Sequence, residues 1–370
     1  MRAVPSSVVG CFRLVSMTVA NTIMTGARGL VTMTRSTSSS AALGGLVAVV
    51  YVSEGRCREK LNLLETTARQ SCLKHGTRLV NVFRDAEYNR TGFTLGIKQH
   101  QCPIDDQEED ISIGVVEPLR QSALALTERA LALVDLREHS ATHPRCGVVD
   151  HISCHAIGEA NHDLAANLAR CLGEGIGQKL RVPVLLYGLA SPAGVQLADL
   201  RRKHGYFQET AVGGGGAGGG GWAGAHVIKG GRLVADFGPS EVSPEAGIVM
   251  LGATPWICNY NVPISIDLPC DVENMMKAAR RVARNVSERG GGLPAVQAMA
   301  LPHGSDADKG IMTVEIACNL LDVSVTGPDM VQAKVKSLCS SKTGSADFEW
   351  NVGSGYVTNM SSAGIMKELV

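Results

Sequence analysis

The sequence has 370 residues, and its 35 basic and 35 acidic side chains give a formal net charge of zero. A neutral chain without a dense block of Lys or Arg, and with only 4% aromatic residues, disfavours nucleic acid as a partner. Hydrophobic residues make up 45% of the chain, which is ample for a core, but no apolar run is long enough to cross a bilayer. The 11 cysteines include no Cys-x-x-Cys pair, which indicates a reducing compartment.

The first segment, residues 1–45, is typical of an organelle transit peptide. It holds Arg2, Arg13, Arg28 and Arg35 among many Ser and Thr residues, and the first acidic residue comes only at Glu54. This composition does not separate a mitochondrion from a plastid. We therefore expect delivery to one of these organelles, and otherwise a cytoplasmic location.

Strand-like and helix-like segments alternate from Leu46 onward, which predicts a fold of the α/β or α+β class. In chain order we expect a strand over 46–52, a helix over 56–74, a strand over 77–83, a helix over 116–136, a strand over 148–152, a helix over 163–180, a strand over 182–187 and a helix over 195–204. The acidic stretch 105–110 is interpreted as a solvated insertion.

A glycine-rich run at 213–221 has the composition of a surface loop and not of a nucleotide cradle, because no strand precedes it and no helix follows it. Beyond the run we expect strand material over 248–262, a helix over 272–289, strands over 295–301 and 313–321, and a helix over 328–340. We place a domain boundary near Phe237, which gives an N-terminal subdomain of residues 46–236 and a C-terminal subdomain of residues 237–370.

The run from His139 to Asp150 gathers two imidazoles, a guanidinium and a carboxylate on a helix-to-strand connection. Pro144 biases His143 toward extended backbone, so these side chains leave the chain in defined directions. Histidine is the side chain whose ordinary pKa suits proton transfer near neutral pH. A catalytic site and plain turn chemistry both account for the run.

Zinc ligands can converge at the spacing of His139, His143, His151, Cys154 and His155. Strand alternation would place His151 and His155 on one face and Cys154 on the other. We therefore predict no metal site. His139 is interpreted as a residue that supports a neighbour, or as a satisfied histidine at a helix end.

Several short motifs follow one another in a fixed order along the chain. They are Val52-Ser53-Glu54-Gly55, Tyr88-Asn89-Arg90-Thr91, His143-Pro144-Arg145 with Gly147 and Asp150, the run from Pro183 to Gly188, Asp236-Phe237-Gly238-Pro239, Asn259-Tyr260-Asn261, and Asn319-Leu320-Leu321-Asp322. From about residue 46 to the C-terminus they resemble the formiminotransferase domain of formimidoyltransferase-cyclodeaminase. The runs 148–152 and 287–293 look closest to the plant and algal branch. We expect no cyclodeaminase domain.

The resemblance implies two ferredoxin-like subdomains with mixed β-sheets and helices that enclose a folate cleft. It implies tetrahydrofolate as co-substrate, a glutamate derivative as the other substrate, and a homodimer. It also implies that His143 is the catalytic acid/base. The implied folate-contacting segment consists of Gly238, Pro239, Ser240, Glu241, Val242, Ser243, Pro244, Glu245, Ala246 and Gly247.

The implied reaction suits these residues. N5 of tetrahydrofolate attacks the formimino carbon of N-formimino-L-glutamate, and one neutral imidazole can remove the N5 proton and then deliver a proton to the departing amine. Arg145 and Arg90 would clamp the glutamate carboxylates. Asp85 stands in a shortened loop where the family has a substrate-binding aspartate, and we take it as the equivalent residue.

Other polar residues have two explanations each. Asp150 would either orient an imidazole or hold an arginine. Asn259 and Asn261 alternate along a strand, so they would either face the cleft and bind a pterin or satisfy backbone at a strand end. Ser53 and Glu54 either cap the helix that follows or contact substrate.

We expect a folate-dependent one-carbon transferase that moves a formimino or formyl group between glutamate and tetrahydrofolate. The alternative is a non-catalytic folate-binding protein that retains the fold. Intact His143 and Arg145 argue against this alternative, whereas the shortened loop at Asp85 argues for it.

Overall fold

Two β-sheets with helices packed on them organise the residues that the computed structural model describes, which are 44–99, 108–204, 233–306, 310–340 and 348–370. All of these belong to one contact unit, residues 41–370. The predicted transit segment 1–45, apart from Gly44 and Gly45, and the predicted glycine-rich loop 213–221 lie outside the described residues.

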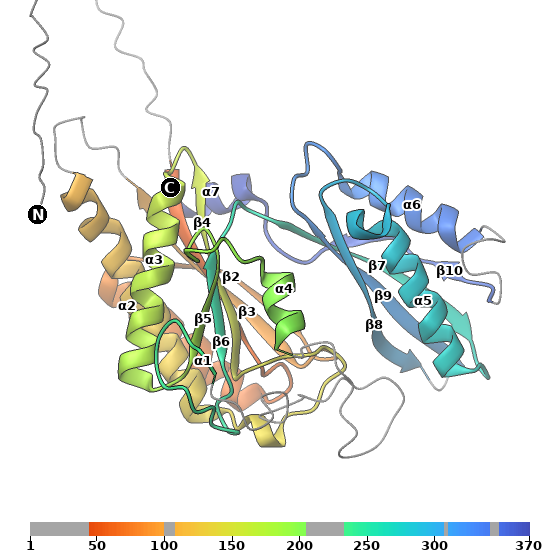
Figure 1. The fold of residues 1–370 in the computed structure, drawn as a ribbon, viewed down its shortest axis with the longest axis horizontal. Coiled ribbons are helices and arrows are strands. Elements are labelled where there is room, and N and C mark those ends of the chain that lie inside the picture. The colour runs from red at the N-terminus through yellow and green to blue at the C-terminus, as the bar shows by residue number, and fades with distance from the viewer. Residues whose placement is uncertain (1–43, 100–107, 205–232, 307–309, 341–347) are drawn as a thin grey trace, which may run out of the picture. The chain divides into compact units, whose positions relative to one another are not determined.

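The first sheet is mixed and has its six strands in the order β2-β3-β1-β4-β6-β5 (Figure 1). Strand β1 is antiparallel to β3 and β4, whereas β6 is parallel to both of its neighbours. The strands are β1 (Gly44–Val52), β2 (Arg78–Asp85), β3 (Arg90–Gln99), β4 (Val149–Gly158), β5 (Val184–Gly188) and β6 (Val249–Ala253). The helices of this part are α1 (Arg58–His75), α2 (Glu108–Leu133), α3 (His162–Gly175) with its π-helical continuation Ile176–Leu180, and α4 (Leu197–Lys203).

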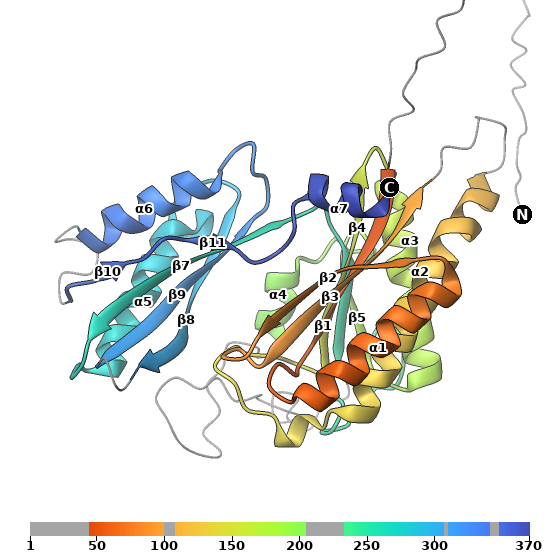
Figure 2. The same cartoon turned by 180° about the vertical axis from the view of Figure 1, so that it is seen from behind.

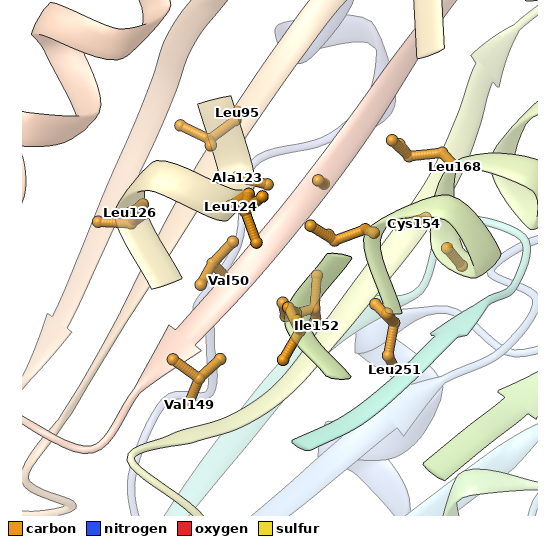
Figure 3. Close-up of a cluster of buried hydrophobic side chains, with 14 of the residues drawn as sticks. Val50, Leu95, Ala123, Leu124, Leu126, Val149, Ile152, Cys154, Leu168 and Leu251 are labelled. Carbon is orange, nitrogen blue, oxygen red and sulfur yellow. The ribbon is translucent and has the colours of Figure 1, made fainter. Parts of the chain in front are cut away.

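Strand β1 is buried on both faces and therefore contributes to two apolar cores. Its even-numbered residues join the core that α1, α2 and α3 cover, which Figure 3 shows with side chains of β1, β4, α2 and α3 meeting. On the other face Val47 and Val49 pack with Ile365 and Leu369 of α7 (Ser362–Leu369), which Figure 2 shows near the C-terminus. This double burial explains why the strand reads as a continuous apolar run.

The second sheet has the order β10-β7-β9-β8, and β11 pairs with β7. Helices α5 and α6 cover one face, where alternate residues of β7 and β9 form the core (Figure 1). By the same alternation, Asn259, Asn261 and Glu315 lie on the opposite face. The elements are β7 (Cys258–Asp267), α5 (Val272–Val286), β8 (Val296–Asp306), β9 (Ile311–Leu320), α6 (Pro328–Ser340), β10 (Asn351–Val352) and β11 (Tyr356–Val357).

The predicted α/β class is confirmed as a mixed α/β fold with two multistranded sheets. Strand β3 was not predicted, because Gly92 and Gly96 interrupt its β-branched and aromatic pattern. A Cβ on Gly92 would lie 3.0 Å from the Tyr51 ring, so glycine makes room for that ring. Strand β6 follows the boundary predicted near Phe237 but belongs to the first sheet, so the change of sheet comes between β6 and β7. Within the described ranges, no helix is both long enough and apolar enough to span a membrane.

Gly247, which precedes β6, lies close to the backbone of Cys146, and a substitution can test this close approach. Its φ is +70°, and an added Cβ would lie 2.3 Å from the Cys146 carbonyl oxygen, whereas Gly76 has a φ of +68° with nothing within 4 Å. We expect Gly76→Ala to cost roughly 1 kcal/mol from backbone strain alone. Gly247→Ala should cost roughly 3 kcal/mol, because backbone must also move. Urea unfolding of both variants measures the difference; equal losses would contradict the close approach.

Candidate active site

A pocket lies where the end of β1 meets the starts of β3 and β4. Because β1 is antiparallel to both neighbours, Val52 pairs with Thr91 on one side and Val149 on the other. The segments that enter or leave these strands therefore converge. The pocket is lined by Tyr51, Val52, Ser53, Tyr88, Asn89, Arg90, His139, His143, Pro144, Arg145 and Asp150.

His143 is half-buried in this pocket, and both of its ring nitrogens have partners. Its Nδ1 lies 2.7 Å from the carbonyl oxygen of Pro144, and its Nε2 lies 2.8 Å from Nη1 of Arg90. The same Nη1 also lies 3.4 Å from Nδ1, so the Pro144 contact decides the tautomer. A carbonyl oxygen only accepts, so Nδ1 carries the proton and Nε2 is the acceptor. His143 is thus a neutral imidazole that lies against the Arg90 guanidinium, with the accepting Nε2 as the nearer ring nitrogen.

The surroundings of His143 keep it neutral. Burial lowers its pKa well below the usual 6.5, and the positive charge of Arg90 lowers it further. The Arg90 guanidinium also lies over the Tyr51 ring, 4.5 Å from the ring centroid. Tyr51 in turn stacks on His151 at 4.3 Å. Arg90 is therefore held between the Tyr51 ring and the His143 ring.

Arg145 supports the loop that carries His143. It is 4% exposed, and its Nη2 donates to the carbonyl oxygens of Ala141 at 3.2 Å and His143 at 2.7 Å. Ser53 supports the next part of the loop, because its hydroxyl donates to the Gly147 carbonyl at 2.7 Å. These contacts fix the backbone on both sides of Pro144.

Asp150 holds an arginine, which is one of the two roles expected for it. Its carboxylate accepts from the Cys146 backbone N–H at 2.6 Å and from Nη2 of Arg201 at 3.2 Å. Burial alone would raise the pKa of Asp150, but His151, Arg201 and the Cys146 N–H hold it well below its usual value. Arg201 lies on α4 and is itself buried, so the charges are paired away from water.

Asp85 links the two sheets. Its carboxylate accepts from the Tyr88 backbone N–H at 2.7 Å and lies 3.2 Å from Nε2 of His303 on β8. Burial would raise its pKa, but His303 and the Tyr88 N–H lower it below the usual value. For His303, burial alone would lower the pKa, but the nearby carboxylates of Asp85 and Glu315 raise it above its usual value.

Glu315 lies at the centre of the same contact and is 1% exposed. Its Oε2 accepts from the Tyr88 hydroxyl and from Nδ2 of Asn261, both at 2.6 Å, and its Oε1 accepts from the Tyr356 hydroxyl. Nδ1 of His303 lies 3.6 Å from Oε1. Asn261 therefore binds a buried carboxylate of the neighbouring strand.

The remaining predicted residues lie in three places. Asn259 donates from Nδ2 to Asn319 Oδ1 at 2.7 Å on the second sheet. The segment 238–247 is an exposed loop at its start, but its end is tied to the pocket loop, because the Ala246 carbonyl accepts from the Val148 N–H and Gly247 bridges to Gly147. Glu54 accepts from the backbone N–H groups of Arg56 and Cys57, which directly precede α1.

Neither His151 nor His155 shares a metal-binding cluster with Cys154. Cys154 is buried in the helix-covered core, on the opposite face of β4 from the two histidines. In the part of the chain that the structure describes, no group of three His, Cys, Asp or Glu residues could hold a metal ion.

Comparison with known proteins decides the family. Residues 45–254 match the model of the formiminotransferase domain, N-terminal subdomain. The formiminotransferase cyclodeaminase-like protein of Arabidopsis thaliana is 37% identical over 289 residues, which cover 78% of this chain and 86% of that protein. The chain belongs to the formiminotransferase family. The resemblance found in the sequence motifs is thereby confirmed.

Two further relatives show how far the similarity extends. Glutamate formimidoyltransferase of Thermoplasma acidophilum is 26% identical, with 67% of this chain and 69% of that protein aligned. Formimidoyltransferase-cyclodeaminase of Rattus norvegicus is 25% identical, and the alignment covers 74% of this chain but 43% of that longer protein. This formiminotransferase is an enzyme of the transferase class.

Sequence reasoning did not find Arg201, His303, Glu315 and Tyr356 of this formiminotransferase. Glu315 contacts Tyr88 across 227 positions, and Arg201 contacts Asp150 across 51. No motif or spacing in the sequence connects such residues. Glu315 occupies an outward position of an alternating strand, where a carboxylate would ordinarily face water.

The pair of Asp85 and His303 should make the stability of this formiminotransferase depend on pH. The raised pKa of His303 means that its contribution is complete below pH 6.5 and is lost as the pH rises through the raised value. Asp85, with its lowered pKa, contributes fully above pH 3.8 and loses its contribution as the pH falls. The pair thus stabilises most between these values.

We expect the difference in free energy of unfolding between the wild type and His303→Gln to be largest in that window and to shrink at higher pH. Urea unfolding over a pH series measures it, with the exposed His162→Gln as the control. A difference that does not change with pH would show that the pair is not charged in the folded protein.

Proposed function

We propose that this formiminotransferase moves a formimino or formyl group between glutamate and tetrahydrofolate, with His143 as general acid/base. The observation that carries the proposal is the neutral His143 imidazole, whose Nε2 lone pair lies in the pocket beside Arg90. A base for proton transfer at neutral pH must be unprotonated before it acts, and the environment of His143 meets this condition.

His143 would serve both proton transfers. Its Nε2 accepts the proton that N5 of tetrahydrofolate loses as the new bond to the one-carbon group forms. It returns that proton to the glutamate nitrogen as the old carbon–nitrogen bond breaks, so no net proton is consumed. The hydrogen bond from Nδ1 to the Pro144 carbonyl stabilises the imidazolium that exists between the two transfers.

Arg90 must move away from Nε2 of His143 before this nitrogen can accept a proton. A carboxylate is a stronger acceptor for a guanidinium than a neutral imidazole is, because the hydrogen bond is charge-assisted. A glutamate carboxylate that enters the pocket would therefore draw Arg90 away from His143. Binding of the glutamate substrate and activation of the base would then be one event.

The fold supports a two-part substrate site. In the first sheet the chain order β1-α1-β2-β3-α2-β4 gives the strand order β2-β3-β1-β4, and β7-α5-β8-β9-α6-β10 repeats that order in the second sheet. This is the pattern of a ferredoxin-like unit. We propose that folate binds between the two units, along the loop from Gly238 to Gly247 and the face that carries Asn259 and Asn261.

The decisive experiment is turnover by the purified chain. It compares N-formimino-L-glutamate and N-formyl-L-glutamate as donors to tetrahydrofolate, and 5-formyl-tetrahydrofolate with glutamate in reverse. His143→Ala should lower kcat roughly 100- to 10,000-fold with the productive donor, because a general acid/base is lost. The exposed His162→Ala serves as the control. Tight binding of tetrahydrofolate without turnover of any donor would reject the transferase mechanism.

The pH dependence of turnover tests the role of Arg90. Because its charge lowers the pKa of His143, replacing it by Met should raise that pKa toward 6.5. Activity requires the neutral imidazole, so the acidic limb of kcat/KM should move to higher pH in Arg90→Met. The exposed Arg69→Met on α1 is the charge-matched control and should leave the limb in place. An unmoved limb in Arg90→Met would show that Arg90 does not act on His143.

We also propose import into a mitochondrion or plastid and assembly as a homodimer. The arginine-rich, acid-poor residues 1–45 support the first proposal, and the family resemblance supports the second. Imaging of a C-terminal fluorescent fusion tests the first, and sedimentation tests the second.

A further inference from the structure

We propose that His139 is a second functional imidazole of the pocket, which donates a hydrogen bond from Nε2–H to a carboxylate oxygen of the glutamate substrate. The proposal rests on the function proposed above and assigns a substrate-binding role to a residue whose spacing indicated only a supporting one. Three steps lead to it: the orientation of Asn89, the position of the proton on His139, and the complementarity with His143.

The orientation of the Asn89 amide is fixed by its surroundings. Its Oδ1 lies 2.8 Å from the backbone nitrogen of Gly55, which can only donate, so this end of the amide is the oxygen. Its Nδ2 is 3.1 Å from the Ser140 carbonyl oxygen and 3.2 Å from Nδ1 of His139. Asn89 has a φ of 45°, a conformation that asparagine tolerates, and these three hydrogen bonds hold it there.

The amide decides where His139 carries its proton. Nδ2 of Asn89 donates to both partners, so Nδ1 of His139 accepts, and the proton of the neutral ring lies on Nε2. This Nε2 is buried and has no hydrogen-bond partner among the residues that the structure describes. A buried donor left without an acceptor is destabilising. A bound ligand that offers an acceptor would remove this destabilisation.

The two histidines of the pocket carry opposite hydrogen-bonding groups at Nε2. Nε2 of His143 is an acceptor, whereas Nε2 of His139 is buried and carries a proton, and both residues line the same pocket with Arg90. One imidazole is therefore prepared to accept a proton and the other to donate a hydrogen bond. Arg90 and His139 together offer a charged and a neutral donor, which suits the two oxygens of a carboxylate.

Three substitutions at position 139 separate this role from a structural one. His139→Asn can keep an acceptor for Asn89 but has no atom at the position of Nε2, whereas His139→Gln places its amide nitrogen near that position. We expect His139→Asn and His139→Ala to raise KM for the glutamate substrate roughly tenfold, which corresponds to about 1.4 kcal/mol, with kcat and KM for tetrahydrofolate unchanged. His139→Gln should recover most of the loss, and the exposed His162→Asn is the control. An unchanged KM in His139→Asn, or a fall in kcat alone, would overturn the proposal.

A measurement that does not depend on turnover completes the test. In protein labelled with ¹⁵N-histidine, the His139 ring, assigned through the His139→Gln variant, should show an unprotonated Nδ1 and a protonated Nε2. Addition of L-glutamate should shift the Nε2 resonance. A proton on Nδ1, or an Nε2 resonance that does not respond to glutamate, would reject the proposal. If the wild type transfers neither one-carbon group, the proposed function fails, and the glutamate titration still decides the role of His139.

Discussion

The hydrogen bond between the Tyr88 hydroxyl and the buried carboxylate of Glu315 is the contact on which the organisation of the pocket depends. A carboxylate that is 1% exposed is tolerated only when its oxygens are satisfied, and Tyr88, Asn261 and Tyr356 satisfy them. Tyr88 comes from the turn between β2 and β3, whereas its partner lies in the second sheet. The position of that turn is therefore determined by residues more than 200 positions away.

The next residue of this turn, Asn89, and the first residue of β3, Arg90, contact the two histidines. Asn89 accepts from Gly55 and donates to His139, and Arg90 donates to His143. Asn89 thereby determines which nitrogen of His139 carries the proton, whereas the Pro144 carbonyl determines it for His143. A displacement of Tyr88 would move Asn89 and Arg90 with it. The hydrogen bonds of the two histidines are therefore coupled to the contact between the sheets.

Much of this arrangement could be predicted from the sequence, because it depends on local patterns. The apolar runs gave the strands and helices, and the spacing of His143, Arg145 and Asp150 indicated that they act together. Other parts depend on contacts that no local pattern encodes. Gly92 of strand β3 leaves the space that the Tyr51 ring occupies. Arg201 reaches Asp150 because of the way α4 packs. The contact of Asn261 with Glu315, 54 positions away, is likewise made by the pairing of strands and not by a local motif.

The two arginines of the pocket illustrate why residue type alone does not determine a role. Both were expected to clamp carboxylates, since guanidinium groups suit that task. Arg145 is buried and donates to two backbone carbonyls of the loop that carries His143, so its movement toward a substrate would release that loop. Arg90 instead contacts the face of the Tyr51 ring and the neutral imidazole of His143, and a carboxylate competes well with both. Arg90 is thus the arginine that can change partners, and its movement away from His143 also makes Nε2 available as a base.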